Sequence, residues 1–315
     1  MKISIAICTW NRSRLLDQTL SSLSRMSVPD DLSWELIVVD NNSTEAGVNN
    51  VLDSWKNKLP LNSVVEKEPG HSASRNRAVQ EATGDYLVWT DNDVMVSPNW
   101  LSAYHDAFQK HPEAGFFGGP IEPVFEEGQP TWIRDTWKIC APVYATRNLG
   151  KTESALGIGK MPYGANFAVR MDLQKKTPYD TQWGRKQSGM LGEDEVSVLR
   201  HLLGEGVMGY WVPDASLHHM IPKDRATVGY VASYFYGQGQ ANALKGNITR
   251  SAARIWWDGW KSLCGYYLRK PVAPPINWLS NRVHAAICWG ELAGLRSLVK
   301  RESIAPDESK DSPPT

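Results

Sequence analysis

The sequence predicts an α/β protein, with a mostly parallel, twisted sheet flanked by helices and a C-terminal helical extension. Short apolar runs alternate with amphipathic segments over the first 120 residues, and this β-α-β-α order is typical of a parallel sheet with helices on both faces. From about residue 225 onward the pattern becomes helical and aromatic. A chain of 315 residues with 42% hydrophobic residues can bury a large core without disulfides.

Four apolar runs predict the strands of the first half. Residues 3–8 (ISIAIC) form a nearly continuous Ile-rich run, as in a parallel strand that is buried on both faces. Helices are expected between the strands, where apolar residues recur every three or four positions after a capping side chain. The other strands are predicted at 35–39, 64–65 and 86–89. One helix is predicted after Asn11, with Leu16, Leu20 and Leu23 on its apolar face, and a second at 71–82. A third helix is predicted after Ser97, with Leu101, Tyr104 and Phe108 on its apolar face.

The second half is less regular, and its elements are shorter. A Pro- and Trp-containing stretch at 128–148 is expected to be a long loop, and residues 304–315 are expected to be a frayed polar tail. Strands are predicted at 118–125, 166–170 and 210–212, and a short helix around Val196, Leu199 and Leu203.

Charge is unevenly distributed in this chain, although its formal net charge is zero. Residues 250–301 hold nine Lys/Arg and two acids, together with five of the 14 tryptophans. This segment predicts either a peripheral membrane contact or a helical subdomain that packs on the rest of the chain or on a second copy in a homodimer. Nucleic-acid binding is not expected of a neutral chain with so modest a basic segment.

The expected location is the cytoplasm, with the inner face of the plasma membrane as the site of any peripheral contact. No run of roughly 18 apolar residues predicts a membrane-spanning helix, and the apolar stretch at 3–8 is shorter than a signal-peptide core. The four cysteines are scattered, which fits a reducing compartment and no disulfide framework.

Two carboxylates, Asp91 and Asp93, follow the apolar run at 86–89. Ligands of open α/β sheets bind beyond the carboxyl ends of the strands, and two acids so close together repel unless a cation or a proton intervenes. Mg²⁺ or Mn²⁺ takes carboxylate oxygens and shares its other positions with phosphates and water. The sequence therefore favours a divalent-metal site here over an ordinary turn, which Asp and Asn also form.

Further polar side chains follow the other predicted strands. Asp40 either accepts hydrogen bonds from a ribose or base, or is a simple turn acid. Thr9, Asn11 and Arg12 follow the first strand and can wrap a nucleobase. Residues 70–77 (GHSASRNR) open a helix with two arginines, which favours a bound diphosphate or, alternatively, a surface Arg pair.

Acids at 193–195 and two histidines at 218–219 complete the candidates. Three consecutive acids fit the positive end of a helix dipole, so they are either a capping cluster or include a general base. One imidazole of the histidine pair can complete a metal shell, whereas a single His is most often structural.

Taken together, these motifs resemble the family 2 glycosyltransferases, which have the GT-A fold. The resemblance is specific because the motifs occur in the family's order over residues 2–225. The sequence departs from the family at residues 91–93 (DND), where many members have a more acidic run. The matching segments are ISIAICTWNR, ELIVVDNNST, GHSASRNRAV, GDYLVWTDNDV, YGANFAVR, LGEDEVSVL and VPDASLHHMIPKDR.

The resemblance implies an inverting transfer of a sugar from a UDP-, dTDP- or GDP-sugar to a glycan or lipid-linked acceptor, in polysaccharide or cell-surface glycan biosynthesis. It implies that Asp194 is the general base, and that Asp93 and His219 hold Mg²⁺ or Mn²⁺ on the diphosphate. Asp91 is expected to face the ribose or the sugar. The other implied donor-binding residues are Thr9, Asn11, Arg12, Asp40, Asn42, Gly70, Ser74, Arg75, Asn92 and Asn166, and the acceptor-side candidates are Glu193 and Trp132.

The resemblance also divides the chain into a catalytic domain at 1–224 and a helical extension at 225–303. Within the catalytic domain, the nucleotide-sugar half is expected at 1–120 and the acceptor half at 121–224. One alternative is a sugar-nucleotide pyrophosphorylase, but such an enzyme should carry a Gly-rich loop after the first strand, and residues 9–15 contain no glycine. The other alternative, a catalytically silent sugar-binding protein, would not need the three acids at 91, 93 and 194.

Overall fold

The computed structural model describes residues 1–184, 192 and 194–302, and these form two compact units. The first unit runs to Thr227 and the second begins at Val228. This border is close to position 225, where the sequence places the start of the helical extension. The predicted tail at 304–315 lies outside the described residues.

The first unit is built around a mainly parallel sheet, which confirms the predicted α/β fold. Among the described residues its strands run in the order β3-β2-β1-β4-β9-β6-β10-β8. Pairing from β3 through β4 is parallel, and β9 is antiparallel to both of its neighbours. The strands are β1 (Lys2–Thr9), β2 (Ser33–Asp40), β3 (Leu61–Val65), β4 (Tyr86–Asp91), β6 (Phe116–Gly118), β8 (Ser154–Ala155), β9 (Asn166–Arg170) and β10 (Gly209–Trp211).

A smaller sheet extends from the end of the DND segment. It has the order β5-β11-β7, from β5 (Val94–Val96), β11 (Leu217–Ile221) and β7 (Ile121–Phe125). The backbone N–H of Met220 donates to the carbonyl oxygen of Asp93 at 2.8 Å. This sheet therefore brings the histidine-bearing strand next to Asp93.

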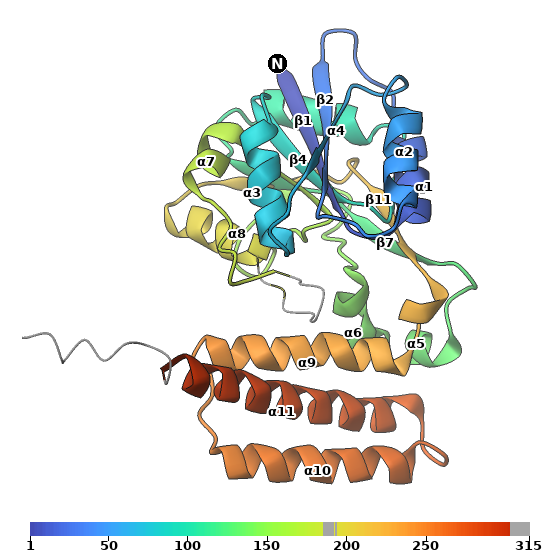
Figure 1. Cartoon of the computed structure of the whole chain (residues 1–315), viewed down its shortest axis with the longest axis vertical. Helices are drawn as coiled ribbons and strands as arrows, with labels where there is room; N and C mark the ends of the chain where they lie inside the picture. The colour runs from blue at the N-terminus through green and yellow to red at the C-terminus, as the bar shows by residue number, and fades with distance from the viewer. Residues whose placement is uncertain (185–191, 193, 303–315) are drawn as a thin grey trace, which may run out of the picture. The chain divides into compact units, whose positions relative to one another are not determined.

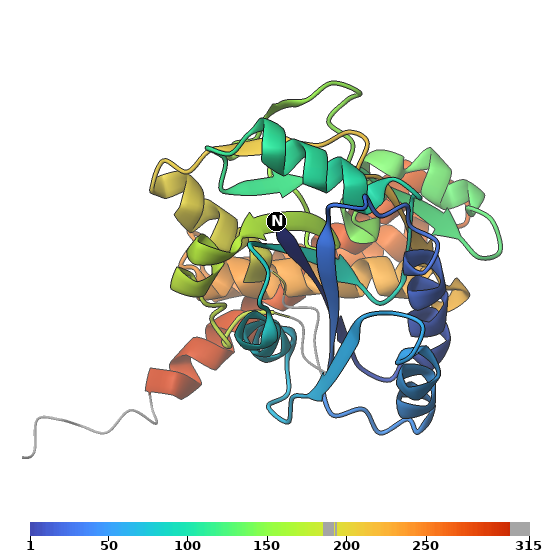
Figure 2. The same ribbon diagram turned by 90° about the horizontal axis from the view of Figure 1, so that it is seen from above.

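Helices cover both faces of the larger sheet (Figures 1 and 2). In β1, Ile5 joins the core that includes α1 and α4, whereas Ala6 joins the core that includes α3 and α8. Because successive side chains of a strand point to opposite faces, a continuous apolar run fits a strand covered on both sides. The first face carries α1 (Ser13–Leu23), α2 (Gly47–Trp55) and α4 (Trp100–Lys110), and the second carries α3 (His71–Glu81), α7 (Met171–Lys176) and α8 (Asp194–Gly204).

Two predicted helix caps are wrong. Asn11 has a φ of 50°, and its side-chain oxygen accepts the backbone N–H groups of Thr44 and Glu45 at 2.8 and 2.9 Å instead of capping α1. The hydroxyl of Ser97 makes no hydrogen bond within the described residues, and its backbone N–H donates to the carbonyl of Ser216. In both cases a contact with a distant segment replaces the local cap, and sequence spacing does not reveal such contacts.

The long loop predicted at 128–148 is also wrong. The segment forms α5 (Thr131–Asp135), α6 (Trp137–Cys140) and a 3₁₀ turn (Ala141–Tyr144). Pro130 and Pro142 stand at or just before the starts of these turns, where proline is tolerated, so they do not mark a loop. Buried side chains at Ile133, Cys140, Val143 and Tyr144 anchor the segment.

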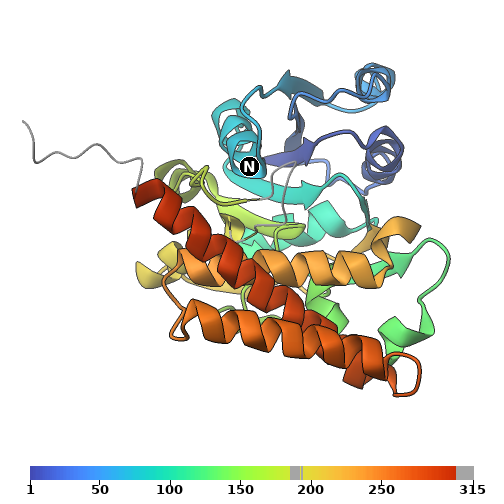
Figure 3. The same cartoon turned by 60° about the horizontal axis from the view of Figure 1, so that its bottom comes forward.

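The second unit consists of three helices, α9 (Val228–Leu244), α10 (Ala252–Arg269) and α11 (Pro275–Glu302), which confirms the predicted helical extension. Helix α11 packs against both of the others (Figures 1 and 3). A Cβ atom at Gly290 would lie 2.0 Å from the carbonyl oxygen of Tyr236, so α9 and α11 approach closely only because glycine is there. None of the described helices is both long enough and apolar enough to cross a membrane.

Gly290→Ala is expected to destabilise the second unit by about 1–3 kcal/mol, because the added methyl group overlaps the backbone of α9. Hydrogen–deuterium exchange should become faster in α9 and α11 and stay unchanged in the strands of the first unit. Gly204→Ala is the matched control, because a Cβ at this position meets nothing within 4 Å. Equal exchange in the two variants would contradict the close packing of these helices.

Candidate functional site

Parallel pairing brings the carboxyl ends of three strands together. In the register of β1 with its neighbours, Thr9 lies opposite Asp40 and Cys8 lies opposite Asp91. The amide nitrogen of Asn92 donates to Thr9 Oγ1 at 2.7 Å. Side chains that follow separate strands in the sequence thus meet at one edge of the sheet, as expected of an open α/β sheet.

Asp93 lies at the centre of a cationic cluster. Its carboxylate is 2% exposed, and its Oδ2 accepts hydrogen bonds from Nη1 of Arg12 at 2.9 Å and Nη1 of Arg225 at 2.8 Å. Its Oδ1 lies 3.5 Å from Nε2 of His219. We call these four residues the Asp93 cluster.

The surrounding cations keep Asp93 ionised. Burial by itself raises the pKa of this carboxyl, but His219 and then Arg225 outweigh burial and hold the pKa well below its ordinary value. Two guanidinium groups converge on this single carboxylate. Guanidinium groups also bind phosphate oxygens well, so the cluster suits an anionic ligand.

Two atoms of the Asp93 cluster fit a divalent cation, although no group of three or more His, Cys, Asp or Glu side chains is arranged around a metal position in the described part of the chain. Oδ1 of Asp93 makes no hydrogen bond to any described residue. Nδ1 of His219 lies 3.0 Å from the carbonyl oxygen of Tyr144, and donation to that oxygen makes Nε2 the nitrogen that faces a metal, which would replace any proton there. A carboxylate oxygen beside such a nitrogen suits Mg²⁺ or Mn²⁺ that takes its other ligands from phosphates and water.

A second cluster forms around Asp194, the first residue of α8. Oδ2 of Asp194 lies 2.8 Å from Nδ1 of His71, which begins α3, and 3.5 Å from Nη1 of Arg75. Glu195 lies 3.8 Å from the same guanidinium and accepts the backbone N–H of Gly164 at 3.3 Å. We call Asp194, Glu195, His71 and Arg75 the Asp194 cluster. Asp194 itself is 3% exposed and lies at the positive end of helix α8.

Arg75 is enclosed by aromatic rings. Its guanidinium carbon lies 5.3, 5.5 and 5.2 Å from the ring centroids of Trp89, Phe167 and Tyr179, and the residue is 2% exposed. Rings at this distance attract a cation, and Asp194 supplies the opposing charge. The structure thus shows Arg75 buried against carboxylates, so its predicted contact with a donor stays a prediction that this geometry does not favour.

The two acids of the Asp194 cluster have opposite protonation tendencies. Burial raises the pKa of Asp194, but Arg75 and His71 outweigh burial and hold it well below the ordinary value. Burial and the neighbouring charge of Asp194 raise the pKa of Glu195 above its usual range. Asp91 also acts electrostatically on Arg75, so the DND segment and the Asp194 cluster share one neighbourhood. In this cluster the pKa of Asp194 is lowered and the pKa of Glu195 is raised.

Several predicted donor-binding residues shape the backbone around this edge. Oδ1 of Asp40 accepts the N–H of Ser43, so Asp40 forms the turn that the sequence left as an alternative. Gly70 has a φ of 131°, which favours glycine, and its N–H donates to Asn41. Asn42 has a φ of 56°, and the buried Ser74 donates to the carbonyl of Gly70. Their predicted contacts with a donor remain predictions.

Asn166 has a structural role in this fold. Its Oδ1 accepts hydrogen bonds from Trp100 Nε1 and Tyr104 Oη, both at 2.9 Å. Its Nδ2 donates to the carbonyl oxygens of Pro120 and Ala215 at 2.9 and 2.8 Å. The side chain is fully buried and all of its hydrogen-bonding capacity is used, so its predicted place in the donor pocket would require these bonds to rearrange.

Of the acceptor-side candidates, Trp132 is half-buried on α5, and Glu193 lies outside the described residues. Sequence reasoning gave no role to His71 or Arg225, and it named Glu195 only as one of the three acids at 193–195. His71 stands inside the quoted GHSASRNR segment and Arg225 ends the quoted KDR segment, so the resemblance pointed to both positions without assigning them a partner.

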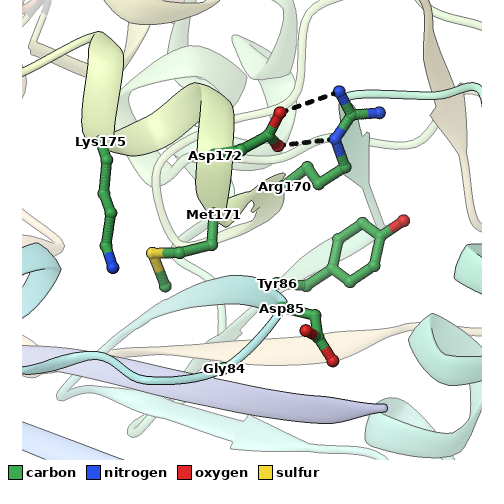
Figure 4. A pocket seen from close by; sticks show the side chains of 7 residues that line it. All are labelled: Gly84, Asp85, Tyr86, Arg170, Met171, Asp172 and Lys175. Atoms are coloured by element: carbon green, nitrogen blue, oxygen red, sulfur yellow. Dashed lines mark hydrogen bonds and ion pairs between the residues drawn. The ribbon is translucent and has the colours of Figure 1, made fainter.

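A pocket of about 530 Å³ lies at the opposite, amino end of β4 (Figure 4). Tyr86 and Arg170 line it, and Arg170 pairs there with Asp172 at 2.7 Å. None of the predicted site residues lines this pocket, so the candidate site remains at the carboxyl edge of the sheet.

Comparisons with known proteins agree with this interpretation. Residues 4–173 match the model of glycosyl transferase family 2. Because this match spans more than half of the chain, the protein belongs to glycosyl transferase family 2 and is a glycosyltransferase. The pyrophosphorylase alternative is not favoured by this match.

Relatives and solved structures extend the likeness beyond the matched region. The succinoglycan biosynthesis protein ExoM of Rhizobium meliloti is 27% identical over 270 residues, which cover 83% of this chain and 82% of ExoM. The poly(ribitol-phosphate) beta-glucosyltransferase of Bacillus spizizenii is 29% identical over 133 residues, which cover 41% of this chain and 20% of that relative. The mannosyltransferase PcManGT of Pyrobaculum calidifontis, solved with GDP-Man and Mn²⁺, has a TM-score of 0.54 at 18% identity over 96% of this chain and 75% of its own. This structural likeness confirms the predicted GT-A fold.

Asn166→Ala is expected to lower the free energy of unfolding by more than about 3 kcal/mol, because it leaves several buried polar groups unpaired, at about 1–3 kcal/mol each. Chemical denaturation followed by tryptophan fluorescence measures this loss. Asn62→Ala, at an exposed position of β3, is the control and should change stability by less than about 0.5 kcal/mol. A similarly small effect at Asn166 would contradict its structural role.

Proposed function

We propose that this family 2 glycosyltransferase transfers a sugar from a nucleotide-diphosphate donor to an acceptor hydroxyl with inversion at the anomeric carbon. The observation that carries the proposal is the burial of Asp194 against Arg75 and His71, which keeps a carboxylate ionised at the ligand-binding edge of the sheet. The Asp93 cluster at the same edge offers positive charge to a diphosphate.

In this proposal Asp194 is the general base. The acceptor oxygen attacks C1 of the donor sugar while its proton passes to a carboxylate oxygen of Asp194, and the bond from C1 to the diphosphate oxygen breaks in the same displacement. A single displacement inverts C1 and needs no enzyme nucleophile. A low pKa suits a base that accepts its proton late, as the hydroxyl becomes acidic in the transition state. His71 orients the carboxylate through its 2.8 Å contact.

The leaving diphosphate is stabilised at the Asp93 cluster. Asp93 and His219 are the residues that would hold Mg²⁺ or Mn²⁺, which when bound neutralises charge that develops on the diphosphate. Arg12 is partly exposed, and its planar guanidinium is suited to contact phosphate oxygens. Asp91 faces the ribose or the sugar in this arrangement, and Thr9 positions the loop through Asn92.

In a second candidate mechanism, the arginines of the Asp93 cluster stabilise the leaving diphosphate without a metal. The observation that favours it is the convergence of Arg12 and Arg225 on a single oxygen of Asp93, at 2.9 and 2.8 Å. If Asp93 serves only to hold these guanidinium groups, they contact the diphosphate directly.

For the donor we propose a UDP-, dTDP- or GDP-sugar, and for the acceptor a glycan or a lipid-linked sugar, with Trp132 as an acceptor-side contact. The relative named for succinoglycan biosynthesis supports a role in polysaccharide or cell-surface glycan assembly. The proposed location is cytoplasmic, with a peripheral membrane contact or a homodimer formed through the helical extension.

Asp93→Asn is expected to lower the Mn²⁺-dependent affinity for the nucleoside diphosphate by at least about 10-fold, because the carboxylate that holds the metal loses its charge. Titration calorimetry with UDP, dTDP and GDP, with Mn²⁺ or with EDTA, measures the affinity. Asp85→Asn, an exposed acid just before β4, should leave it unchanged. Wild-type affinity that survives EDTA but is lost in Arg225→Gln would instead support the metal-free candidate.

Asp194→Asn is expected to lower the rate of sugar transfer by about 10²–10⁴-fold, because the proton acceptor is removed, while donor affinity is retained, because the Asp93 cluster holds the diphosphate. Glu195→Gln is the matched control, since a neutral glutamine replaces a carboxyl whose raised pKa favours its neutral form, and its rate should stay within a few-fold of wild type. Product formation followed by anomeric NMR measures both the rate and the inversion. The base assignment fails if Glu195→Gln is as inactive as Asp194→Asn, or if the product retains the donor configuration.

A further inference from the structure

Helix α10 exposes a row of large apolar side chains. Trp256, Trp257, Trp260, Tyr267 and Leu268 are between 44% and 75% exposed. At 3.6 residues per turn these positions fall within a sector of about 120° around the helix, so they form one continuous surface, which we call the α10 face. Exposed apolar patches of this kind mark interaction sites on soluble proteins.

The opposite side of α10 packs against the neighbouring helix. Ile255, Gly259 and Tyr266 are buried on that side, and Ile255 packs with Cys288 of α11. Trp256 and Trp257 are therefore not needed to hold the helix on its neighbour, whereas Trp260 also packs on the ring of Trp289 in α11 at a centroid distance of 5.6 Å.

Cations flank the α10 face, and the acids nearby are already paired. Arg254 and Lys261 lie beside the tryptophans along the helix, and Arg269 and Lys270 lie at its C-terminal end, all four exposed. Between residues 228 and 299 there are eight Lys/Arg and two acids. Both acids, Asp258 and Glu291, form ion pairs with Arg250 at 3.1 and 2.7 Å. Asp258 also pairs with Arg254 at 3.3 Å, so Lys261, Arg269 and Lys270 are the cations of this surface that neither acid contacts within an ion-pair distance. The surface is thus apolar at its centre and positively charged at its rim.

We propose that the α10 face binds the surface of an anionic lipid bilayer. Tryptophan and tyrosine favour the headgroup region of a membrane, where a ring is half in contact with acyl chains and half hydrated, and flanking Lys and Arg reach the lipid phosphates. The helix would lie in the plane of the bilayer surface, with the exposed Val272 of the following turn adding apolar contact at its end.

The positive charge around the α10 face favours a lipid surface, rather than a second copy of this chain, as its binding partner. A symmetric contact through the α10 face would place Lys261, Arg269 and Lys270 of both copies along one interface, and the two nearby acids are already engaged with Arg250 and Arg254. An anionic bilayer supplies the missing counter-charge. The inference does not depend on the proposed transfer reaction, but it would bring the enzyme to a lipid-linked acceptor.

The test is co-sedimentation of the full chain with vesicles of phosphatidylcholine alone or mixed with phosphatidylglycerol. Wild type should bind the mixed vesicles, with a blue shift of its tryptophan fluorescence, and should bind the neutral vesicles at least 10-fold more weakly. Trp256→Ser/Trp257→Ser should abolish binding. Lys261→Gln/Lys270→Gln should weaken it by roughly 30-fold, at about 1 kcal/mol per cation near the surface.

The matched control is Ile158→Ser/Met208→Ser, which removes two exposed apolar side chains from the first unit and should bind like wild type. Circular dichroism checks that every variant keeps its helices. The proposal is overturned if the wild-type protein does not bind the anionic vesicles, or if the tryptophan and lysine variants bind them as well as the control does. It is also overturned if sedimentation velocity shows a lipid-free dimer that the tryptophan substitutions dissociate.

Discussion

Buried carboxylates can remain charged at the carboxyl edge of this sheet only because cations are buried with them. Burial raises the pKa of both carboxyls, and this effect is outweighed by His219 and Arg225 at Asp93 and by Arg75 and His71 at Asp194. Each cation comes from an element far along the chain, so the β5-β11 pairing and the packing of α3 near the start of α8 are prerequisites for the site. The aromatic rings around Arg75 complete this arrangement, since they accommodate a guanidinium that few polar groups reach.

The same arrangement separates two chemical roles. Around Asp93 two guanidinium groups converge, which suits the binding of a diphosphate and the stabilisation of its departure. Around Asp194, burial and the charge of Asp194 raise the pKa of Glu195, so Asp194 is the carboxylate better suited to accept a proton. A conformational requirement accompanies both roles, because Gly70 and Asn42 hold left-handed backbone conformations in the loops that lead to this edge.

Much of the first unit could be predicted from the sequence because its strands are buried on both faces. Such strands read as apolar runs, and the acids that follow them fall at the ligand-binding edge by topology alone. The partners of those acids could not be predicted, since Arg225 lies 132 residues from Asp93 and His71 lies 123 residues from Asp194. The failed caps at Asn11 and Ser97 have the same cause, because distant backbone groups compete with the local helix. Asn166 was recognised through its motif, but only the packing shows that four hydrogen bonds occupy it.

The most direct test is anomalous diffraction from a crystal of the wild-type chain soaked with Mn²⁺ and a nucleoside diphosphate. The account predicts a manganese peak in contact with Oδ1 of Asp93 and Nε2 of His219, with the diphosphate between that ion and the guanidinium of Arg12. A nucleotide bound elsewhere on the chain, with no manganese at this edge and with Asp93 contacted only by its arginines, would contradict it.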